Sequence, residues 1–296
     1  MSIEGRGTVA AVIVATIWGL SFVAARIILT TLSPVLLAAL RFFIASVVFA
    51  PIILRESNQG GVLPHKDLGE LAVLGFLSIS VYFWLQYTGV KFAGAGISAL
   101  LVVGLIPILT GLASSVLLRE RLNSRKALGT ALGLLGVTLI TVPGLLIEKV
   151  DWRFYIGVAC LFGNAACWAL YSTMSRRLMK RIQRPALVTA WVTIFGTLAL
   201  IPMSLSSDWS RLGSLTPLQW SGVAYLAIVC SGLGYFLWNY ALSRLEAVKA
   251  AVWLYLEPIM AFIGEIIILG ATPSVTTILG GVVVILGALI TSRTRS

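Results

Sequence analysis

The hydrophobic positions of this chain form long unbroken runs and do not alternate with polar positions. A helix needs about 20 apolar residues to cross the roughly 30 Å hydrocarbon core of a bilayer. Because a backbone in lipid must satisfy its own hydrogen bonds, each run of that length predicts a helix. Breaks at charge clusters, prolines and glycines give ten runs: 8–29, 34–54, 68–88, 92–118, 127–146, 154–174, 185–204, 217–240, 247–269 and 275–292.

The composition agrees with a chain that is solvated by lipid. Hydrophobic residues make up 58% and charged residues 11% of the chain, against roughly 45–50% and about 25% in soluble proteins. These values exclude a soluble enzyme, a disordered chain and a secreted disulfide scaffold. The first run could be a cleaved signal peptide, since Val23-Ala24-Ala25 loosely resembles a cleavage site. It extends beyond a normal signal-peptide core, so we expect a membrane span.

The basic residues are divided unevenly between the two sides of the predicted membrane. The chain has 22 Lys and Arg against 11 Asp and Glu, a net charge of +11. Sixteen basic residues fall on the side of the N-terminus and five on the other side, while Arg41 lies within the second run. The positive-inside rule predicts a multi-pass protein of the cytoplasmic (inner) membrane with both termini in the cytoplasm. Short loops do not supply a nucleic-acid surface, so we expect no nucleic-acid partner.

Residues that hold metals, disulfides or nucleotides are scarce. Cys160, Cys167 and Cys230 lie inside apolar runs, where thiols are usually inert packing groups. His65 is the lone histidine, and no G-x-x-x-x-G-K-[ST] loop occurs in the sequence. We therefore expect no metal, no cofactor, no catalytic residue and no step driven by ATP.

The second half of the sequence repeats the first. Matched positions, at offsets of 150 to 153 residues, are Leu128-Gly129 with Leu279-Gly280, Gly136 with Gly287, Pro34 with Pro185, Pro51 with Pro202, Pro107 with Pro258, Trp18 with Trp168, and Tyr82-Phe83 with Tyr235-Phe236. The predicted units, 1–147 and 154–296, hold five spans each within one membrane domain. Because five is odd, the second unit enters the membrane from the opposite side. The predicted fold is an all-α integral membrane protein of ten transmembrane helices, two inverted five-helix repeats around a central cavity.

Inverted repeats are typical of secondary transporters, because the two halves can exchange an inward-open and an outward-open conformation. Duplicated helical units also build channels and membrane enzymes. A channel is disfavoured because the sequence shows no ring of like charges and no filter-like loop. An enzyme is disfavoured by one histidine and few acids. The pattern therefore favours transport by alternating access.

Several local motifs resemble those of EamA-type members of the drug/metabolite transporter superfamily. They are Trp18-Gly19 followed by Ser21, Leu40-Arg41-Phe42, the run from Ala99 to Pro107, Leu118-Arg119-Glu120-Arg121-Leu122, and Leu256-Glu257-Pro258. The chain departs at Leu269-Gly270-Ala271, where the family often has a glutamate that matches Glu120. The resemblance covers nearly the whole chain and implies ten spans, a central pocket and movement of small metabolites. The chain looks closest to the bacterial amino-acid exporter branch, which also implies the direction of transport.

Two polar stripes match across the repeat. Polar side chains inside a membrane tend to face the interior of a helix bundle, and residues four apart share a helix face. One stripe alone could be glue between helices, but a matched pair favours a shared substrate pathway. The stripes are Ser78, Tyr82 and Gln86 in the third run, and Ser231, Tyr235 and Asn239 in the eighth.

The ninth run carries Lys249, Trp253 and Glu257 at helical spacing, with Glu265 two turns further and Pro258 directly after Glu257. An acid inside an apolar span is by default a functional-site hypothesis. Glu257 is predicted to bind a substrate ammonium or to take a proton; the alternative is a local role at the proline kink. Lys249 and Trp253 are further pathway candidates, and Glu265 ranks below them.

The sixth run contributes Asn164 and Trp168 to the predicted pathway, with Ser172 on the same face. Trp168 matches Trp18 across the repeat, and both lie in the middle of their spans. Arg41 is expected to snorkel or to pair with a carbonyl or an acid.

Glycine and proline interrupt the fourth and ninth runs, and such interruptions at matching positions point to a transporter's site. The predicted hinges are Gly94, Gly96, Gly104 and Pro107 in the fourth run and Pro258 in the ninth. Two small-residue faces are expected to let helices pack closely. They are Gly129, Gly133 and Gly136, and Gly280, Val284 and Gly287.

The leading hypothesis is a secondary transporter that exports small metabolites, above all amino acids. Hydrogen-bonding groups, aromatic faces and few charges suit a zwitterion. The same aromatic walls with Glu257 as counter-charge suit an organic cation, so a multidrug-type exporter is the closest alternative. Lys249 and Arg41 are too few cations to suggest nucleotide sugars. Protons are a candidate coupling partner, and the sequence leaves the oligomeric state open.

Overall fold

The computed structural model describes residues 3–58, 63, 65–93, 95–120, 123–141, 152–269 and 275–292, and no strand occurs among them. The first half contains α1 (Ile3–Ile28), α2 (Pro34–Asn58), α3 (His65–Gly75), η1 (Phe76–Val81), α4 (Tyr82–Ala93), α5 (Ala95–Leu117) and α6 (Ser124–Thr141). The second half contains α7 (Trp152–Ile182), α8 (Pro185–Ser204), η3 (Trp209–Ser214), α9 (Pro217–Ala224), η4 (Tyr225–Gly234), α10 (Tyr235–Leu242), α11 (Ala247–Ala251), η5 (Val252–Leu256), α12 (Glu257–Leu269) and α13 (Val275–Ser292).

A helical segment occupies every run that the hydrophobic pattern predicts, so the all-helical prediction is confirmed. The third, eighth and ninth runs are each built from three consecutive elements: α3–η1–α4, α9–η4–α10 and α11–η5–α12. Among the described residues, seven helices are long and apolar enough to cross a membrane, and there are shorter apolar helices at Leu101–Leu117 and Ile278–Thr291. Residues 142–146, the end of the fifth run, lie outside the described residues.

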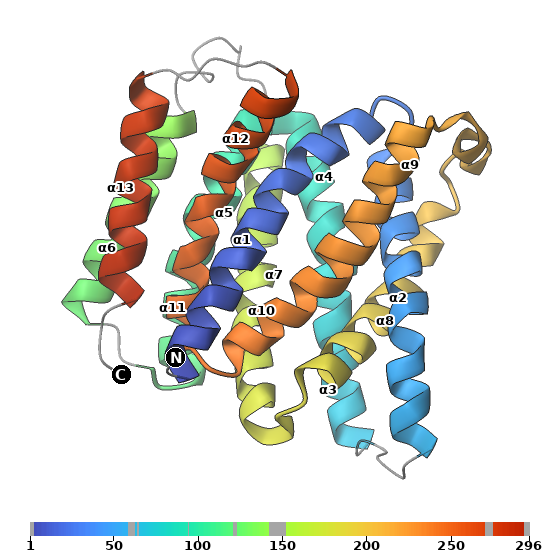
Figure 1. Ribbon diagram of the computed structural model, residues 1–296, viewed down its shortest axis with the longest axis horizontal. Helices are drawn as coiled ribbons and strands as arrows, with labels where there is room; N and C mark the ends of the chain where they lie inside the picture. Colours follow the sequence, from blue (N-terminus) through green and yellow to red (C-terminus); the bar gives the residue numbers. More distant parts are fainter. Residues whose placement is uncertain are drawn as a thin grey trace.

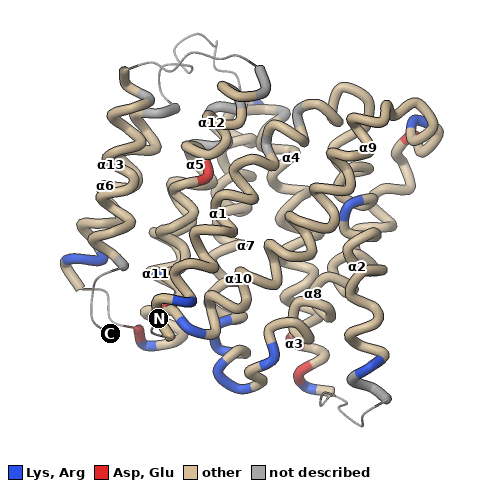
Figure 2. The backbone as a smooth tube through the Cα atoms, in the orientation of Figure 1, with Lys and Arg blue, Asp and Glu red and all other residues tan. Residues whose placement is uncertain are grey.

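The helices stand side by side as a bundle (Figure 1). α1 begins and α13 ends at the same end of this bundle, the lower end in the view of Figure 1. Most Lys and Arg residues gather there (Figure 2), and we call it the basic end; the opposite end is the far end. The uneven charge that the loops predict is therefore present in the fold.

α6 and α13 pack against each other along their glycine faces, as predicted. A Cβ atom on Gly129 would lie 2.5 Å from the carbonyl oxygen of Gly287, and one on Gly136 would lie 2.6 Å from that of Gly280. Only glycine allows such a close approach of the two backbones. Because the earlier glycine of α6 meets the later glycine of α13, the two helices run antiparallel.

The contacts between helices follow the sequence repeat. α4 and α5 pack on α7, just as their equivalents α10 and α12 pack on α1. Ser46 of α2 and Thr197 of α8, 151 residues apart, share a hydrogen bond of 2.9 Å between their hydroxyls. Tyr255 donates at 3.2 Å to the carbonyl oxygen of Gly104, again 151 residues away. Bonds between equivalent positions are what two halves related by a two-fold axis would produce.

Three elements within the predicted spans depart from α geometry. η1 and η4 are π-helical, lie at matching places in the repeat and lead into Tyr82 and Tyr235. π turns occur frequently at functional sites. η5 is a 3-10 turn that ends directly before Glu257 and Pro258. The hydrophobic pattern predicts the interruption at Pro258 but not the two π turns.

Candidate functional site

Aromatic side chains from both halves fill the centre of the bundle. Trp18 of α1 meets Trp168 of α7 edge to face, with ring centroids 5.1 Å apart. Tyr235 of α10 lies 5.7 Å from each of them. Tyr82 of α4 and Trp238 of α10 lie 5.3 Å and 5.9 Å from Trp168. We call these five residues the aromatic centre, and four of them are residues that the sequence places in one pathway.

The two polar stripes also meet there. The hydroxyl of Tyr235 donates to the carbonyl oxygen of Ser78 at 3.2 Å. The side-chain amide of Asn164 donates to the carbonyl oxygen of Tyr82 at 2.7 Å. Gln86 lies one turn beyond Tyr82 on α4 and is partly buried. The stripe of one half is thus hydrogen-bonded to the stripe of the other.

Several buried polar atoms in and near the aromatic centre make no hydrogen bond to any residue that the structure describes. Buried polar groups are nearly always paired with protein, water or a ligand. The unpaired set holds indole donors, an amide acceptor and hydroxyls, so it can bind a small molecule of mixed polarity. Its members are Ser78 Oγ, Asn164 Oδ1, Trp168 Nε1, Ser172 Oγ and Trp238 Nε1; Trp253 Nε1 in η5 is also buried and unpaired among the described residues.

Arg41 of α2 lies buried within the bundle. Its Nε donates to the hydroxyl of Ser231 at 2.8 Å. Its guanidinium carbon lies 5.1 Å from the ring centroid of Phe42 and 5.4 Å from that of Phe83. The expectation of snorkelling, or of a carbonyl or acid partner, is therefore wrong: a serine hydroxyl and two aromatic faces hold this cation. Ser231 is thereby engaged with the protein itself.

Glu257 begins α12 and is only partly buried. It lies close enough to Tyr82 for an electrostatic interaction. Within the described part of the chain, its carboxyl group makes no hydrogen bond or ion pair. A Cβ atom on Gly19 would lie 2.6 Å from the carbonyl oxygen of Glu257. Glycine in the Trp18-Gly19 motif thus lets α12 approach α1 and sets Glu257 beside the aromatic centre.

The side-chain amide of Asn239 is hydrogen-bonded to three other side chains of the protein. Its amide accepts from the hydroxyl of Ser175 and donates to the hydroxyls of Tyr171, at 3.1 Å, and Thr189, at 2.9 Å. Its place in a substrate pathway stays a prediction.

Lys249 does not lie at the aromatic centre. It is eight residues before Glu257, which is about 12 Å along a helix, and its Nζ lies 3.3 Å from a carboxylate oxygen of Glu4 at the basic end.

The predicted hinges fall at different kinds of place. Gly96 lies in the first turn of α5, Pro107 lies inside α5, and Pro258 is the second residue of α12. Gly94 lies outside the described residues, and so does the side chain of Glu265. Of these described positions, Pro258 is the one that follows a change of helix type, because the 3-10 turn η5 ends directly before Glu257 and Pro258.

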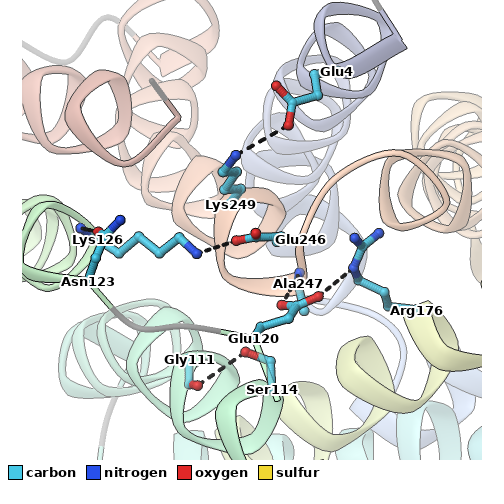
Figure 3. A network of polar contacts seen from close by, with 10 residues as sticks. All are labelled: Glu4, Gly111, Ser114, Glu120, Asn123, Lys126, Arg176, Glu246, Ala247 and Lys249. Atoms are coloured by element: carbon cyan, nitrogen blue, oxygen red, sulfur yellow. Dashed lines mark hydrogen bonds and ion pairs between the residues drawn. The ribbon is translucent and has the colours of Figure 1, made fainter. Parts of the chain in front are cut away.

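A second polar feature lies at the basic end (Figure 3), and the sequence did not predict it. Glu120 follows α5 and accepts from Nε of Arg176 in α7 at 2.7 Å. It also accepts from the backbone N–H of Ala247, at the start of α11, at 3.2 Å. The side chains of Glu120 and Arg176 are 7% and 12% exposed, and removing one partner of a buried pair costs roughly 3–5 kcal/mol. Glu120 therefore ties α5 to α7 and α11.

The other ion pairs of this end also join the first half to the second. We call the whole set the basic-end network. It contains Glu120 with Arg176, Lys126 with Glu246, Lys249 with Glu4, Arg177 with Glu70, and Arg181 with Asp67 and Glu70. The described residues of the far end contain one ion pair, between Asp208 and Arg211 at 3.4 Å. These two residues are three positions apart, so this pair does not join the halves. Among the described residues, ion pairs between the two halves therefore occur only at the basic end.

Comparison with known families matches both halves. The model of the EamA-like transporter family matches residues 5–142 and again residues 155–293. The chain belongs to the EamA-like transporter family. The resemblance that the local motifs indicate is thereby confirmed, and this EamA-like transporter is a multi-pass membrane protein.

Similar proteins carry transporter names. An uncharacterized transporter of Archaeoglobus fulgidus is 30% identical over 286 residues, covering 95% of this chain and 96% of the relative. The uncharacterized transporter YyaM of Bacillus subtilis is 28% identical, covering 93% and 89%. A probable terminal-alkyne amino-acid exporter of Streptantibioticus cattleyicolor is 25% identical, covering 96% and 92%. A solved crystal structure, 22% identical with a TM-score of 0.80, covers 97% of this chain and 96% of its own and shares the fold.

Proposed function

We propose that this EamA-like transporter exports small zwitterionic metabolites, amino acids first among them, by alternating access across the cytoplasmic membrane. The carrying observation is the aromatic centre, which holds unpaired polar atoms and whose Tyr82 interacts electrostatically with Glu257. A zwitterion presents an ammonium and a carboxylate within a small volume. Glu257 and the aromatic faces suit the ammonium, and the indole N–H of Trp168 suits the carboxylate. The relative named as a probable amino-acid exporter supports the same class.

The closest alternative is export of organic cations. Glu257 and the aromatic faces would serve a lone cation equally well. The unpaired donors at Trp168 and Trp238 favour the zwitterion, because a cation without a carboxylate leaves them unused.

We also propose that ten spans cross the membrane as two inverted repeats, 1–147 and 154–296. The antiparallel packing of α6 against α13 supports this arrangement. These helices are repeat equivalents, and in a parallel repeat they would run in the same direction. We place the basic end in the cytoplasm, because cytoplasmic loops carry the excess of Lys and Arg.

In this arrangement the basic-end network holds the transporter closed to the cytoplasm. Loading substrate from the cytoplasm requires these ion pairs to separate, while the far end closes. The π turns η1 and η4, and η5 with Pro258, are the proposed places where the spans change direction.

Counterflow into proteoliposomes tests the substrate class. Purified protein is reconstituted, and unlabelled amino acids, organic cations and nucleotide sugars compete with a radiolabelled amino acid. We expect amino acids to compete and nucleotide sugars not to compete. Competition by organic cations alone would favour the alternative, and the absence of amino-acid counterflow would contradict the proposal.

A further inference from the structure

Two adjoining cavities lie at the basic end, away from the aromatic centre. The larger has a volume of about 740 Å³ and lies between the start of α1, the turn from α7 to α8, and the end of α10. The smaller has a volume of about 340 Å³ and runs along α1 and α10. Arg6, Phe236 and Tyr240 line both, so the two cavities lie next to each other. Transport as proposed above does not use them.

The larger cavity is positively charged. Arg6, Lys180, Arg184 and Arg244 line it, and no acidic residue is among the lining residues that the structure describes. Arg244 stacks on the ring of Tyr240 at 3.5 Å and donates to a serine hydroxyl. Within the described part of the chain, Arg6, Lys180 and Arg244 make no ion pair.

The neighbouring cations of this end behave differently, because those of the basic-end network each have a carboxylate partner. The larger cavity instead brings four cations together on one lining, and an anion is the ligand that this charge attracts.

The start of α8 adds to this charge. Pro185, Ala186 and Leu187 line the cavity, and α8 continues for 20 residues. Arg184 is the N-cap residue and makes no capping hydrogen bond with its side chain. Pro185 has no N–H, so the backbone donors of this helix start at Ala186 and Leu187, and a helix N-terminus attracts anions.

The smaller cavity is mainly apolar. Beside the shared residues, it is lined by Val9, Ala10, Ile13 and Leu237. Val9 and Ile13 are 46% and 42% exposed. Arg6, Val9, Ala10 and Ile13 lie on one face of α1, and this face rises about 10 Å from the basic end into the apolar body of the bundle. A soluble anion would use the basic cavity and leave the apolar one empty.

We propose that the two cavities form a binding site for an anionic phospholipid. The phosphate lies among Arg6, Lys180 and Arg244, and an acyl chain follows Val9 and Ile13. Charge complementarity selects an anionic headgroup such as phosphatidylglycerol over a zwitterionic one. The site stands at the level where α1, α7 and α8 begin or end, which is where headgroups of the adjacent leaflet lie.

Binding of phosphatidylglycerol to the purified full chain tests the charged part of the site. Arg6→Gln/Lys180→Gln removes two exposed cations that make no ion pair in the described structure. Arg119→Gln/Arg125→Gln is the matched control, because these arginines are also exposed, lie at the same end and do not line the cavity. Affinities are measured by native mass spectrometry with phosphatidylglycerol and with phosphatidylcholine.

We expect the wild type to prefer phosphatidylglycerol. The cavity variant should bind it about 25-fold more weakly, about fivefold for each cation, while the control changes little. Equal losses in both variants, or no preference between the two lipids, would overturn the proposal.

A second arm separates a lipid from a soluble anion. Val9→Trp fills the apolar cavity and leaves every cation in place. It should weaken phosphatidylglycerol binding without changing the melting temperature of the lipid-free protein. Inorganic phosphate serves as the soluble probe, and we expect it to bind far more weakly than the lipid and equally to both proteins. Phosphate binding as tight as that of the lipid, with no effect of Val9→Trp, would assign the site to a soluble anion.

Discussion

Tyr82 and Tyr235 occupy equivalent positions of the two halves and meet at one site. Sequence spacing predicted that they would lie in the same pathway, and Trp18 and Trp168 likewise. The spacing could not predict which polar side chains form hydrogen bonds to other residues of the protein. Asn239 is surrounded by Ser175, Tyr171 and Thr189, partners that come from other helices and leave no local signal.

The first prediction concerns these two tyrosines. Tyr82→Ala or Tyr235→Ala should lower amino-acid flux in proteoliposomes by about tenfold, since an aromatic contact contributes about 0.5–1.5 kcal/mol. Trp84→Ala is the control, because Trp84 is a neighbouring aromatic residue of α4 that is 51% exposed. Normal flux in both tyrosine variants would show that the aromatic centre is not part of the substrate pathway.

The second prediction concerns Glu257, whose carboxyl group makes no hydrogen bond in the described structure. In the wild type, flux should fall as the pH falls through the titration of this group, because the neutral acid no longer attracts an ammonium. Glu257→Gln has the same shape without the charge, so its flux should be lower and independent of pH in that range. If the Glu257→Gln variant keeps the pH profile of the wild type, Glu257 does not bind the ammonium or carry a proton, and only a local role at the proline kink is left.

Among the elements, continuous apolar runs were enough to locate every described α-helix, because the bilayer fixes the length and the hydrogen bonding of a span. The same pattern could not reveal η1 and η4. A π turn changes the hydrogen-bond partner by one residue and leaves the hydrophobicity of the run unchanged. The glycine faces of α6 and α13 were predictable, since small residues at helical spacing have few other uses in a membrane helix.

The third prediction tests that glycine contact. Gly129→Ala should destabilise the protein by about 1–3 kcal/mol, the usual cost of overpacking, because the new Cβ would lie 2.5 Å from the carbonyl oxygen of Gly287. The measurement is the melting temperature in detergent. Gly69→Ala in α3 is the matched control, since a Cβ there meets nothing within 4 Å. An equal shift for both variants would show that close packing at Gly129 is not responsible.

At the scale of the whole molecule, the basic-end network of ion pairs joins the two halves. The sequence did not predict this network. From the sequence, the charged residues of the loops predict only the orientation of the chain in the membrane. Their pairing depends on which loops the fold brings together. Glu120 stood within a family-like motif, Leu118 to Leu122, but its partners Arg176 and Ala247 lie 56 and 127 residues away. Only the tertiary structure shows that these contacts join the two halves at one end.

Cross-linking the two halves tests most directly whether transport requires the basic end to open. Cys160, Cys167 and Cys230 are replaced, and cysteines are introduced as Glu120→Cys/Glu246→Cys. A short bifunctional thiol reagent then joins α5 to the start of α11. Radiolabelled amino-acid flux into proteoliposomes is measured before and after the reaction, with each single variant as control. Flux should be abolished only in the cross-linked double variant; undiminished flux in that variant would contradict alternating access between the two halves.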